Sequence, residues 1–408
     1  MFSIISKSKN FRYFFFADIV SGFGVGMGTV GGNWYILSQM KLDRYVGLLL
    51  AVNVLASFLI SPLSGLLIDK MNRKNVIFMT FVFRAVVLSM ILAMFYFFGF
   101  NLLLMYLYAA VNGIGWTVYL SASRSFIQEI LPSNSLSKGN SLVEISLQVG
   151  MFAAGAASGV IYSFSGFNLI LTINIITFII SGVLISRVSY RSVISDNTIK
   201  DETIVHNFKS GFEYLKKEKL ILFLGIVSII PLAVTMLYNV VLPSYVTNVL
   251  KSNSITFGIS DMSYGIGGLL SGVLISSFSK KSKNTLLIKG LYIIAVLDLL
   301  VLGGNDKEIL IFIGSLLLGV TNSGLRITIN TELMQKVDPK FMGRSMAFWN
   351  GLSLLIQLVG STSIGALIDS IGAQAGFILM GVLMFIGLVG YWLISSHPKY
   401  VDKGIIKE

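Results

Sequence analysis

The stretch SGLLIDKMNRKN, Ser64–Asn75, lies where a long apolar segment meets a cluster of charges. The 24 residues of Tyr45–Ile68 carry no charge, and Asp69 is then followed by three basic residues within five positions. A helix that crosses a membrane needs about 20 consecutive, mostly apolar residues. The stretch therefore predicts a membrane-crossing helix that ends at the membrane surface on one acid and several bases.

The rest of the chain has the same character. Of its 408 residues, 54% are hydrophobic and 12% are charged, whereas soluble domains average about 25% charged residues. The mean hydropathy is +0.80. Other runs without any charge are Ala85–Ser123, Ile145–Ser186, Leu220–Leu250 and Ser370–Pro398. This composition excludes a large soluble core and indicates a protein that crosses the membrane many times.

We expect an all-α membrane protein with twelve transmembrane helices in two six-helix bundles. The helices are expected at residues 11–37, 45–68, 75–98, 102–126, 141–163, 168–187, 220–245, 256–278, 285–303, 309–330, 345–368 and 373–396. The expected domains are an N-terminal bundle (1–188), a cytoplasmic linker (189–219) and a C-terminal bundle (220–408). In the linker, Phe208, Phe212 and Leu215 lie at helical spacing opposite lysines, which predicts an amphipathic helix on the inner membrane surface.

Four similar segments indicate internal repeats. They contain Gly65, Gly159, Gly272 and Gly365, so the glycines are 94, 113 and 93 residues apart. The first and third segments end helices on the expected inner side, and the other two end helices on the outer side. This alternation is what inverted three-helix repeats within each six-helix half would produce.

The basic residues predict the orientation. With the N-terminus inside, the expected cytoplasmic segments hold 26 Lys and Arg residues and the outer loops hold 4. By the positive-inside rule, we expect a multi-pass protein of the cell membrane with both termini cytoplasmic. The net charge of +12 then follows from topology, and no nucleic-acid partner is expected. The chain has no cysteine and its two histidines lie in expected cytoplasmic segments, so we expect no metal site and no cofactor.

With these features the chain resembles the major facilitator superfamily. The signature of that family between helices 2 and 3 is approximately G-x-L-a-D-r-x-G-r-[RK], which Gly65, Leu67, Asp69, Arg73 and Lys74 match. The resemblance implies a contact between the two halves in which this acid holds the outward-open state. It assigns a conformational latch to Asp69, Arg73 and Arg124, with Arg124 as the best-placed partner of Asp69. The alternative is a solvated acid at an ordinary positive-inside boundary.

Further elements resemble the macrolide-efflux branch, whose members are drug–proton antiporters. They are Arg84-Ala85, Leu131-Pro132, Asn140-Ser141-Leu142, Asp338-Pro339 and Met342-Gly343-Arg344. Two positions depart from the antiporter pattern. Asn112 stands where many such proteins carry an Arg, and Ala156 replaces the Pro of a G-P-x-x-G-G element.

Charged residues inside the expected helices are candidate functional groups, because they are costly in a membrane. Asp18 lies about 10 Å inside the first helix, at a rise of 1.5 Å per residue. We expect Asp18, and as a second candidate Glu144, to carry the coupling proton, because burial favours a neutral carboxyl and a nearby Arg favours an ionised one. Arg84 is the expected intramembrane charge partner. The alternative is a static ion pair of either acid with Arg84 or Arg124.

Polar and aromatic residues within the helices are candidates for the substrate cavity. They are Asn33, Trp34, Asn53, Asn112, Trp116, Gln148, Asn239, Asp261, Asn350 and Gln357. Apolar walls with a few polar groups suit amphipathic organic ligands, whereas each residue by itself also fits a packing role. We interpret Asp298 as a solvated acid at a helix end. Gly24, Gly28 and Gly32 form a stripe that allows another helix to approach closely or provides a bending point.

We therefore expect a secondary active transporter, not an enzyme. It would export amphipathic organic compounds such as drugs or antibiotics by proton antiport with alternating access, using the proton motive force. One alternative is a proton- or ion-coupled uptake carrier for a small organic solute or a metal chelate. Another is a non-transporting membrane sensor or scaffold, although the short termini leave little room for a signalling domain. Besides the substrate, protons and the lipid bilayer, no partner is expected, and the protein is expected to be a monomer.

Overall fold

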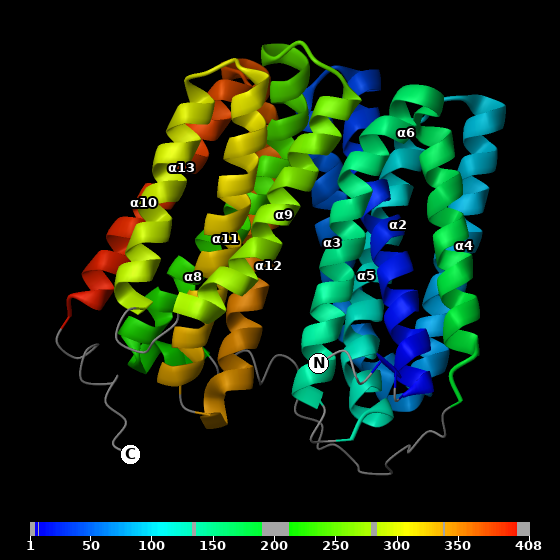
Figure 1. The fold of residues 1–408 in the computed structure, drawn as a ribbon, viewed down its shortest axis with the longest axis horizontal. Coiled ribbons are helices and arrows are strands. Elements are labelled where there is room, and N and C mark those ends of the chain that lie inside the picture. Colours follow the sequence, from blue (N-terminus) through cyan, green and yellow to red (C-terminus); the bar gives the residue numbers. More distant parts are fainter. Residues whose placement is uncertain are drawn as a thin grey trace. The chain divides into compact units, whose positions relative to one another are not determined.

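The computed structural model describes residues 5–6, 8–132, 136–189, 212–278, 284–337 and 339–397, and every regular element in these ranges is helical. Figure 1 shows the long helices, coloured along the sequence. Their bounds are α2 Lys9–Met40, α3 Asp43–Lys70, α4 Arg73–Phe98, α5 Leu102–Ile130, α6 Leu136–Ser186, α8 Lys219–Ser244, a π-helical turn η2 Tyr245–Val249, α9 Ser254–Phe278, α10 Asn284–Gly303, α11 Glu308–Lys336, α12 Pro339–Ile371 and α13 Ala373–Ser395.

Helix α6 is two helices joined at a kink. Gly166 has φ 66° and ψ −163° in the middle of its 51 residues, a conformation that glycine adopts without steric cost. The kink falls between the expected helices 141–163 and 168–187, so the structure contains the twelve expected helices and confirms the fold class. Among the described residues, ten segments are long and apolar enough to cross a membrane. That set counts the two parts of α6 once and does not include α9.

The chain forms two compact units. Unit 1 comprises Met1–Asn197 and Ser252–Met262, and unit 2 comprises Thr198–Lys251 and Ser263–Glu408. Unit 1 thus holds α2 to α6 with the first part of α9, and unit 2 holds α8, η2, the rest of α9 and α10 to α13.

In unit 1 the glycine stripe of α2 serves helix packing. α2 runs unbroken from Lys9 to Met40. A Cβ on Gly24 would lie 2.0 Å from Oγ1 of Thr177, and one on Gly28 would lie 2.2 Å from the hydroxyl of Tyr108. These glycines therefore let α5 and α6 approach α2 closely.

In unit 2 helix α8 continues through Pro231 and Pro243. A proline has no N–H, so Pro231 cannot donate to the carbonyl of Val227 one turn earlier. The hydroxyl of Tyr292, on α10, donates to that carbonyl at 3.2 Å. Gly387 of α13 makes room for the tyrosine, because a Cβ there would lie 2.6 Å from its ring.

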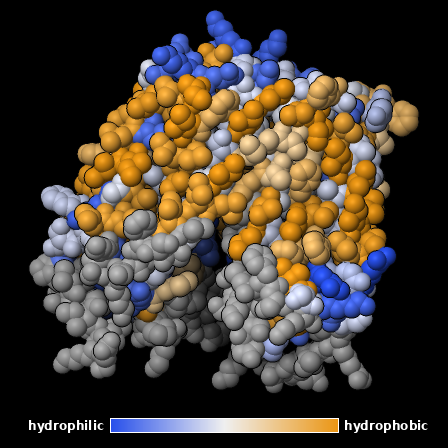
Figure 2. All heavy atoms as spheres, viewed as in Figure 1, coloured by the Kyte–Doolittle hydropathy of each residue, from blue (hydrophilic) through white to orange (hydrophobic). Residues whose placement is uncertain are grey.

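The surface of the helices is suited to lipid. Figure 2 shows hydrophobic side chains over the flanks of the helices and hydrophilic ones gathered near helix ends. Large apolar side chains are widely exposed, among them Phe97 and Phe164 at 83%. In water such a surface would aggregate, whereas in a bilayer it is the expected outer face.

The described end of the linker packs on unit 2. Residues 212–217 are helical. Leu215 is buried, the ring of Tyr214 stacks on Phe341 at 4.4 Å, and that of Phe212 lies 5.4 Å from Phe348. The apolar side of this short helix thus contacts α12. Phe208 and most of the expected linker, 189–219, lie outside the described residues.

Candidate functional site

A buried carboxylate joins three helices of unit 1. Asp18 of α2 is fully buried, and its two oxygens accept hydrogen bonds from the hydroxyls of Tyr119 on α5 and Ser146 on α6. The Ser146 hydroxyl also lies 2.7 Å from the carbonyl oxygen of Val143 on its own helix. Hydrogen bonds to an ionised group are among the stronger ones in proteins. The fold therefore surrounds this acid with neutral donors whose protons can rotate.

Arg84 of α4 is buried, and its described partners are the side chain and backbone carbonyl of Asn112 and an aromatic ring. Its Nη2 donates to Oδ1 of Asn112 at 2.9 Å, and its guanidinium lies 4.3 Å from the ring centre of Phe178. Gly115 leaves space for this side chain, because a Cβ there would lie 2.5 Å from Cδ and Nε of Arg84. No ion pair of Arg84 with Asp18 is found among the described side chains, so the partnership expected for these two residues is not a direct contact.

Aromatic rings connect the acid to the arginine. The ring of Tyr119 lies 5.3 Å from that of Phe81, and Phe81 lies 6.1 Å from Phe178, on which Arg84 packs. A packed series of side chains of this kind can transmit a rearrangement at one group to another. Tyr119, Phe81 and Phe178 carry no charge, and their role was not visible in the sequence.

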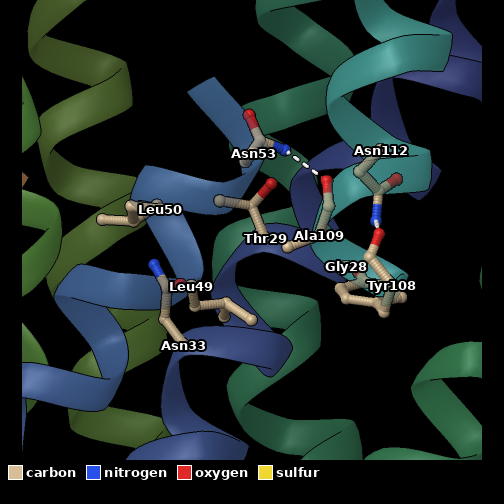
Figure 3. Close-up of a pocket in the computed structure, with 9 residues that line it drawn as sticks. All are labelled: Gly28, Thr29, Asn33, Leu49, Leu50, Asn53, Tyr108, Ala109 and Asn112. Atoms are coloured by element: carbon tan, nitrogen blue, oxygen red, sulfur yellow. Dashed lines mark hydrogen bonds between the residues drawn. The ribbon is translucent and has the colours of Figure 1, made fainter. Parts of the chain in front are cut away.

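A small polar cavity is lined by Asn112, the residue to which Arg84 donates. Figure 3 shows Asn33 of α2, Asn53 of α3 and Asn112 of α5 around it, together with Tyr108. The cavity measures about 30 Å³, which is room for one or a few waters. Nδ2 of Asn53 donates to the carbonyl of Ala109 and Nδ2 of Asn112 to that of Tyr108, each at 3.1 Å. Three of the predicted cavity residues thus meet in one place, and Asn112 joins this cavity to Arg84.

The other candidates of unit 1 are more scattered. Trp34 is buried and stacks on Phe257 at 5.3 Å, and Trp116 is half-buried on α5. Asp261, also half-buried, lies beside α6, because a Cβ on Gly155 would be 3.0 Å from its Oδ2. The side chains of Glu144 and Gln148 lie outside the described residues.

The candidates in unit 2 do not converge. Asn239 is half-buried on α8, and its Nδ2 donates to the carbonyl of Thr235 at 3.0 Å. Gln357 of α12 is buried and donates to Ser353 on the same helix at 2.9 Å. Asn350 is exposed on α12.

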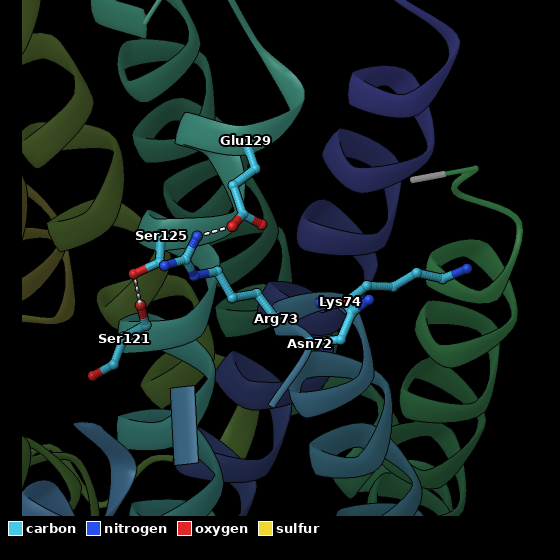
Figure 4. A network of polar contacts seen from close by, with 6 residues as sticks. All are labelled: Asn72, Arg73, Lys74, Ser121, Ser125 and Glu129. Carbon is cyan, nitrogen blue, oxygen red and sulfur yellow. Dashed lines mark hydrogen bonds and ion pairs between the residues drawn. The ribbon is translucent and has the colours of Figure 1, made fainter. Parts of the chain in front are cut away.

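Of the expected latch residues, Asp69 and Arg73 lie at the junction of α3 and α4, and Arg124 lies on α5. Figure 4 shows Arg73 reaching Glu129 at the end of α5, with which it forms an ion pair. Lys74 donates to the carbonyl of Ser186, the last residue of α6, at 2.9 Å and to that of Val188, just after it, at 2.7 Å. Arg124 is exposed, and the side chain of Asp69 lies outside the described residues. The described contacts therefore tie α4 to α5 and α6, and the latch stays a prediction.

Two acids of unit 2 are placed differently from the sequence-based expectation. Asp298 is 8% exposed on α10 and is therefore not a solvated acid. Glu332, which no sequence feature singled out, is 7% exposed and accepts a hydrogen bond from the hydroxyl of Tyr391 at 2.9 Å. The expected helix ended at residue 330, whereas α11 continues to Lys336 and carries Glu332 within it.

Comparison with known proteins identifies the family. The family model described as Major Facilitator Superfamily matches residues 14–361. The chain is 22% identical to the uncharacterized MFS-type transporter YvqJ of Bacillus subtilis, over 98% of this chain and 96% of that protein. It is 20% identical to macrolide efflux protein A of Streptococcus pyogenes, over 79% of this chain and 80% of that protein.

Solved structures show the same fold. A D-xylose-proton symporter superposes with a TM-score of 0.72 at 13% identity, covering 93% of this chain and 97% of that one. A bacterial homolog of the human lysosomal transporter Spinster gives a TM-score of 0.71 at 13% identity, covering 97% of each chain. At these identities the likeness concerns the fold alone. The family model confirms the resemblance drawn from the sequence motifs.

Proposed function

Because the chain belongs to the major facilitator superfamily of multi-pass membrane transporters, we propose that it exports amphipathic organic compounds, such as drugs or antibiotics, by proton antiport. The family implies a small-molecule substrate. The export direction and the substrate class are supported by the distant likeness to macrolide efflux protein A and by the sequence elements shared with that branch. Both termini are proposed to be cytoplasmic because the basic residues concentrate in the segments on that side.

The observation that carries the proposal is the hydrogen bonding around Asp18. When Asp18 is ionised, the hydroxyls of Tyr119 and Ser146 donate to its two oxygens. When Asp18 is protonated, its own O–H can donate to Oγ of Ser146, and the Ser146 proton then turns to the carbonyl of Val143, 2.7 Å away. A hydroxyl can both donate and accept, so the cluster satisfies either protonation state. A proton-coupled transporter needs an acid with this property.

Arg84 and Asn112 extend this site towards the polar cavity. The Arg84 guanidinium contacts Phe178 and Asn112, and Asn112 lines the cavity with Asn33 and Asn53. We propose that protonation of Asp18 changes the packing of Tyr119 and the neighbouring rings, which in turn moves Arg84 and the cavity wall. Alternating access would then open the cavity to one side of the membrane at a time. No cofactor is proposed, and the proton motive force is the proposed energy source.

The test is transport in liposomes under an imposed pH gradient, with erythromycin as substrate. We expect the wild type to move erythromycin against its own gradient only while the pH gradient exists. Asp18→Asn keeps the size of the side chain but cannot exchange the proton, so this variant should only equilibrate the substrate. Asp298→Asn is the matched control, because it neutralises another buried membrane acid, and it should retain uphill transport.

Three results would contradict parts of the proposal. Uphill transport by the wild type with the pH gradient collapsed would exclude proton coupling. Uphill transport by Asp18→Asn at the wild-type level would exclude Asp18 as the coupling acid. If the wild type moves neither erythromycin nor the dye rhodamine 6G, the proposed substrate class is wrong.

A further inference from the structure

Unit 2 contains a polar cluster at mid-helix that the proposed proton site does not involve. Asn322 of α11, Thr235 of α8 and Tyr264 of α9 contact one another. Nδ2 of Asn322 donates to Oγ1 of Thr235 at 2.9 Å and to the Tyr264 hydroxyl at 3.1 Å, and the two hydroxyls are 3.0 Å apart. Asn322 is fully buried near the middle of α11. Polar groups at this depth are costly in a membrane protein and often mark a transport pathway.

Among the described residues, the Oδ1 acceptor of Asn322 has no hydrogen-bond donor. The Thr235 hydroxyl donates to the carbonyl of Pro231 at 3.0 Å and lies 3.0 Å from the Tyr264 hydroxyl. Both N–H groups of Asn322 are used. Its Oδ1 is buried and accepts no hydrogen bond from any residue that the structure describes. The reverse orientation of the amide would bury unpaired N–H groups instead, so the assigned orientation is the better one.

An unpaired acceptor inside a protein costs free energy, and native proteins pair most such groups. The neighbouring residues Thr235 and Tyr264 are half-buried, so part of the surface of each is not covered by the protein. Asn239 lies one turn from Thr235, and its Nδ2 donates to the Thr235 carbonyl at 3.0 Å. The three side chains of the cluster carry no charge, so they recognise a hydrogen-bond donor and not an opposite charge.

We propose that Thr235, Tyr264 and Asn322 form a subsite for a hydrogen-bond donor of the transported compound, a hydroxyl or an N–H group, which is accepted by Oδ1 of Asn322. Asn322 makes the contact, while Thr235 and Tyr264 are positioning residues that hold its amide. This subsite rests on the proposed function, because it assumes that the protein binds amphipathic organic compounds. The alternative is that the cluster only joins three helices, as polar side chains often do in membranes.

Two probes separate these readings. Rhodamine 6G and tetraphenylphosphonium are both lipophilic monocations, but only rhodamine 6G carries N–H donors. Binding of each is measured to the purified full-length protein in detergent. In Asn322→Leu, which has a similar volume, Tyr264 and Thr235 can still bond each other and Pro231. We expect the affinity for rhodamine 6G to fall about tenfold, the effect of losing one buried hydrogen bond. The affinity for tetraphenylphosphonium should change less than about twofold, because the cluster gives this ion no hydrogen bond to lose.

Matched variants guard against a general effect on folding. Thr328→Val removes another buried hydroxyl of α11, which contacts carbonyls of its own helix, 2.7 Å to Gly324 and 3.2 Å to Leu325, and it should leave both affinities unchanged. Thr235→Val removes an acceptor that holds the Asn322 amide and should weaken rhodamine 6G alone. It serves as the second test if Asn322→Leu does not fold.

The outcomes are distinct. Selective loss of rhodamine 6G affinity supports the subsite. Equal loss for both probes, or no loss for either, overturns it and leaves the proposed export function standing. If the wild type binds neither probe, the proposed substrate class fails and the subsite fails with it.

Discussion

The hydroxyl of Tyr292 should stabilise the protein only because Pro231 leaves a carbonyl without its helical donor. Tyr292 donates to the Val227 carbonyl at 3.2 Å, and the residue four positions later, Pro231, has no N–H. Hydrogen bonds between membrane helices are worth about 0.6 kcal/mol on average and up to about 1.7. Leaving a buried group unpaired costs about 1–3 kcal/mol. We therefore expect Tyr292→Phe to lower the free energy of unfolding by about 1.5 kcal/mol.

A double-mutant cycle tests this reasoning. In Pro231→Ala the backbone N–H returns and can serve the Val227 carbonyl, so Tyr292→Phe should then cost less than about 0.5 kcal/mol, giving a coupling of about 1 kcal/mol. The free energies are measured by SDS titration in mixed micelles. Tyr238→Phe is the matched control, because Tyr238 is buried on α8 and bonds Ser315 at 2.7 Å, not a freed carbonyl.

The control should cost the same in both backgrounds. If Tyr292→Phe also costs the same with and without Pro231, the hydroxyl does not serve the carbonyl that the proline frees. The contact would then be ordinary packing.

Two further changes probe unit 1. Gly115→Ala places a Cβ 2.5 Å from the buried Arg84 side chain, so we expect overpacking to cost about 1–3 kcal/mol of stability, measured by thermal unfolding. Gly290→Ala is the control and should be tolerated, because nothing lies within 4 Å of a Cβ there. Equal effects of the two changes would contradict the reasoning. Arg73→Ala removes the ion pair with Glu129, in which the Arg73 side chain is 30% exposed and that of Glu129 12%. The free energy of unfolding should therefore fall by less than about 1 kcal/mol. A loss above about 2 kcal/mol would show that the pair does more than join two helix ends.

The helices were predictable because membrane insertion imposes a strong signal on the sequence. Charge-free runs such as Tyr45–Ile68 have few structural alternatives, and even the division of α6 was expected near Gly166. Helix ends were less certain. Polar residues continue α11 past residue 330 to Lys336, so hydropathy ended the helix too early and Glu332 was missed.

The candidate site was only partly predictable, because sequence gives depth along a helix but not which neighbours face a residue. Depth identified Asp18 as a costly acid. Its donors Tyr119 and Ser146 lie 101 and 128 residues away in the chain, and no spacing connects them. Depth alone also misplaced Asp298, which lies near a helix end but is 8% exposed. Asn322 gave no signal, since a single Asn in a helix does not reveal that its N–H groups find partners on two other helices.

The two halves share a repeat but have not kept the same chemistry. The offset of 207 residues between Gly65 and Gly272 takes Asp18 to Gly225 and Arg84 to Leu291. Gly225 has no room for an acid, because a Cβ there would lie 2.0 Å from the indole of Trp349. A buried charge is costly in a membrane. At these two pairs of matching positions, only the residues of unit 1, Asp18 and Arg84, are charged. Unit 2 instead offers the neutral cluster at Asn322. Although unit 2 also buries Asp298 and Glu332, this difference agrees with our proposals that unit 1 exchanges the proton and that unit 2 binds a polar group of the substrate.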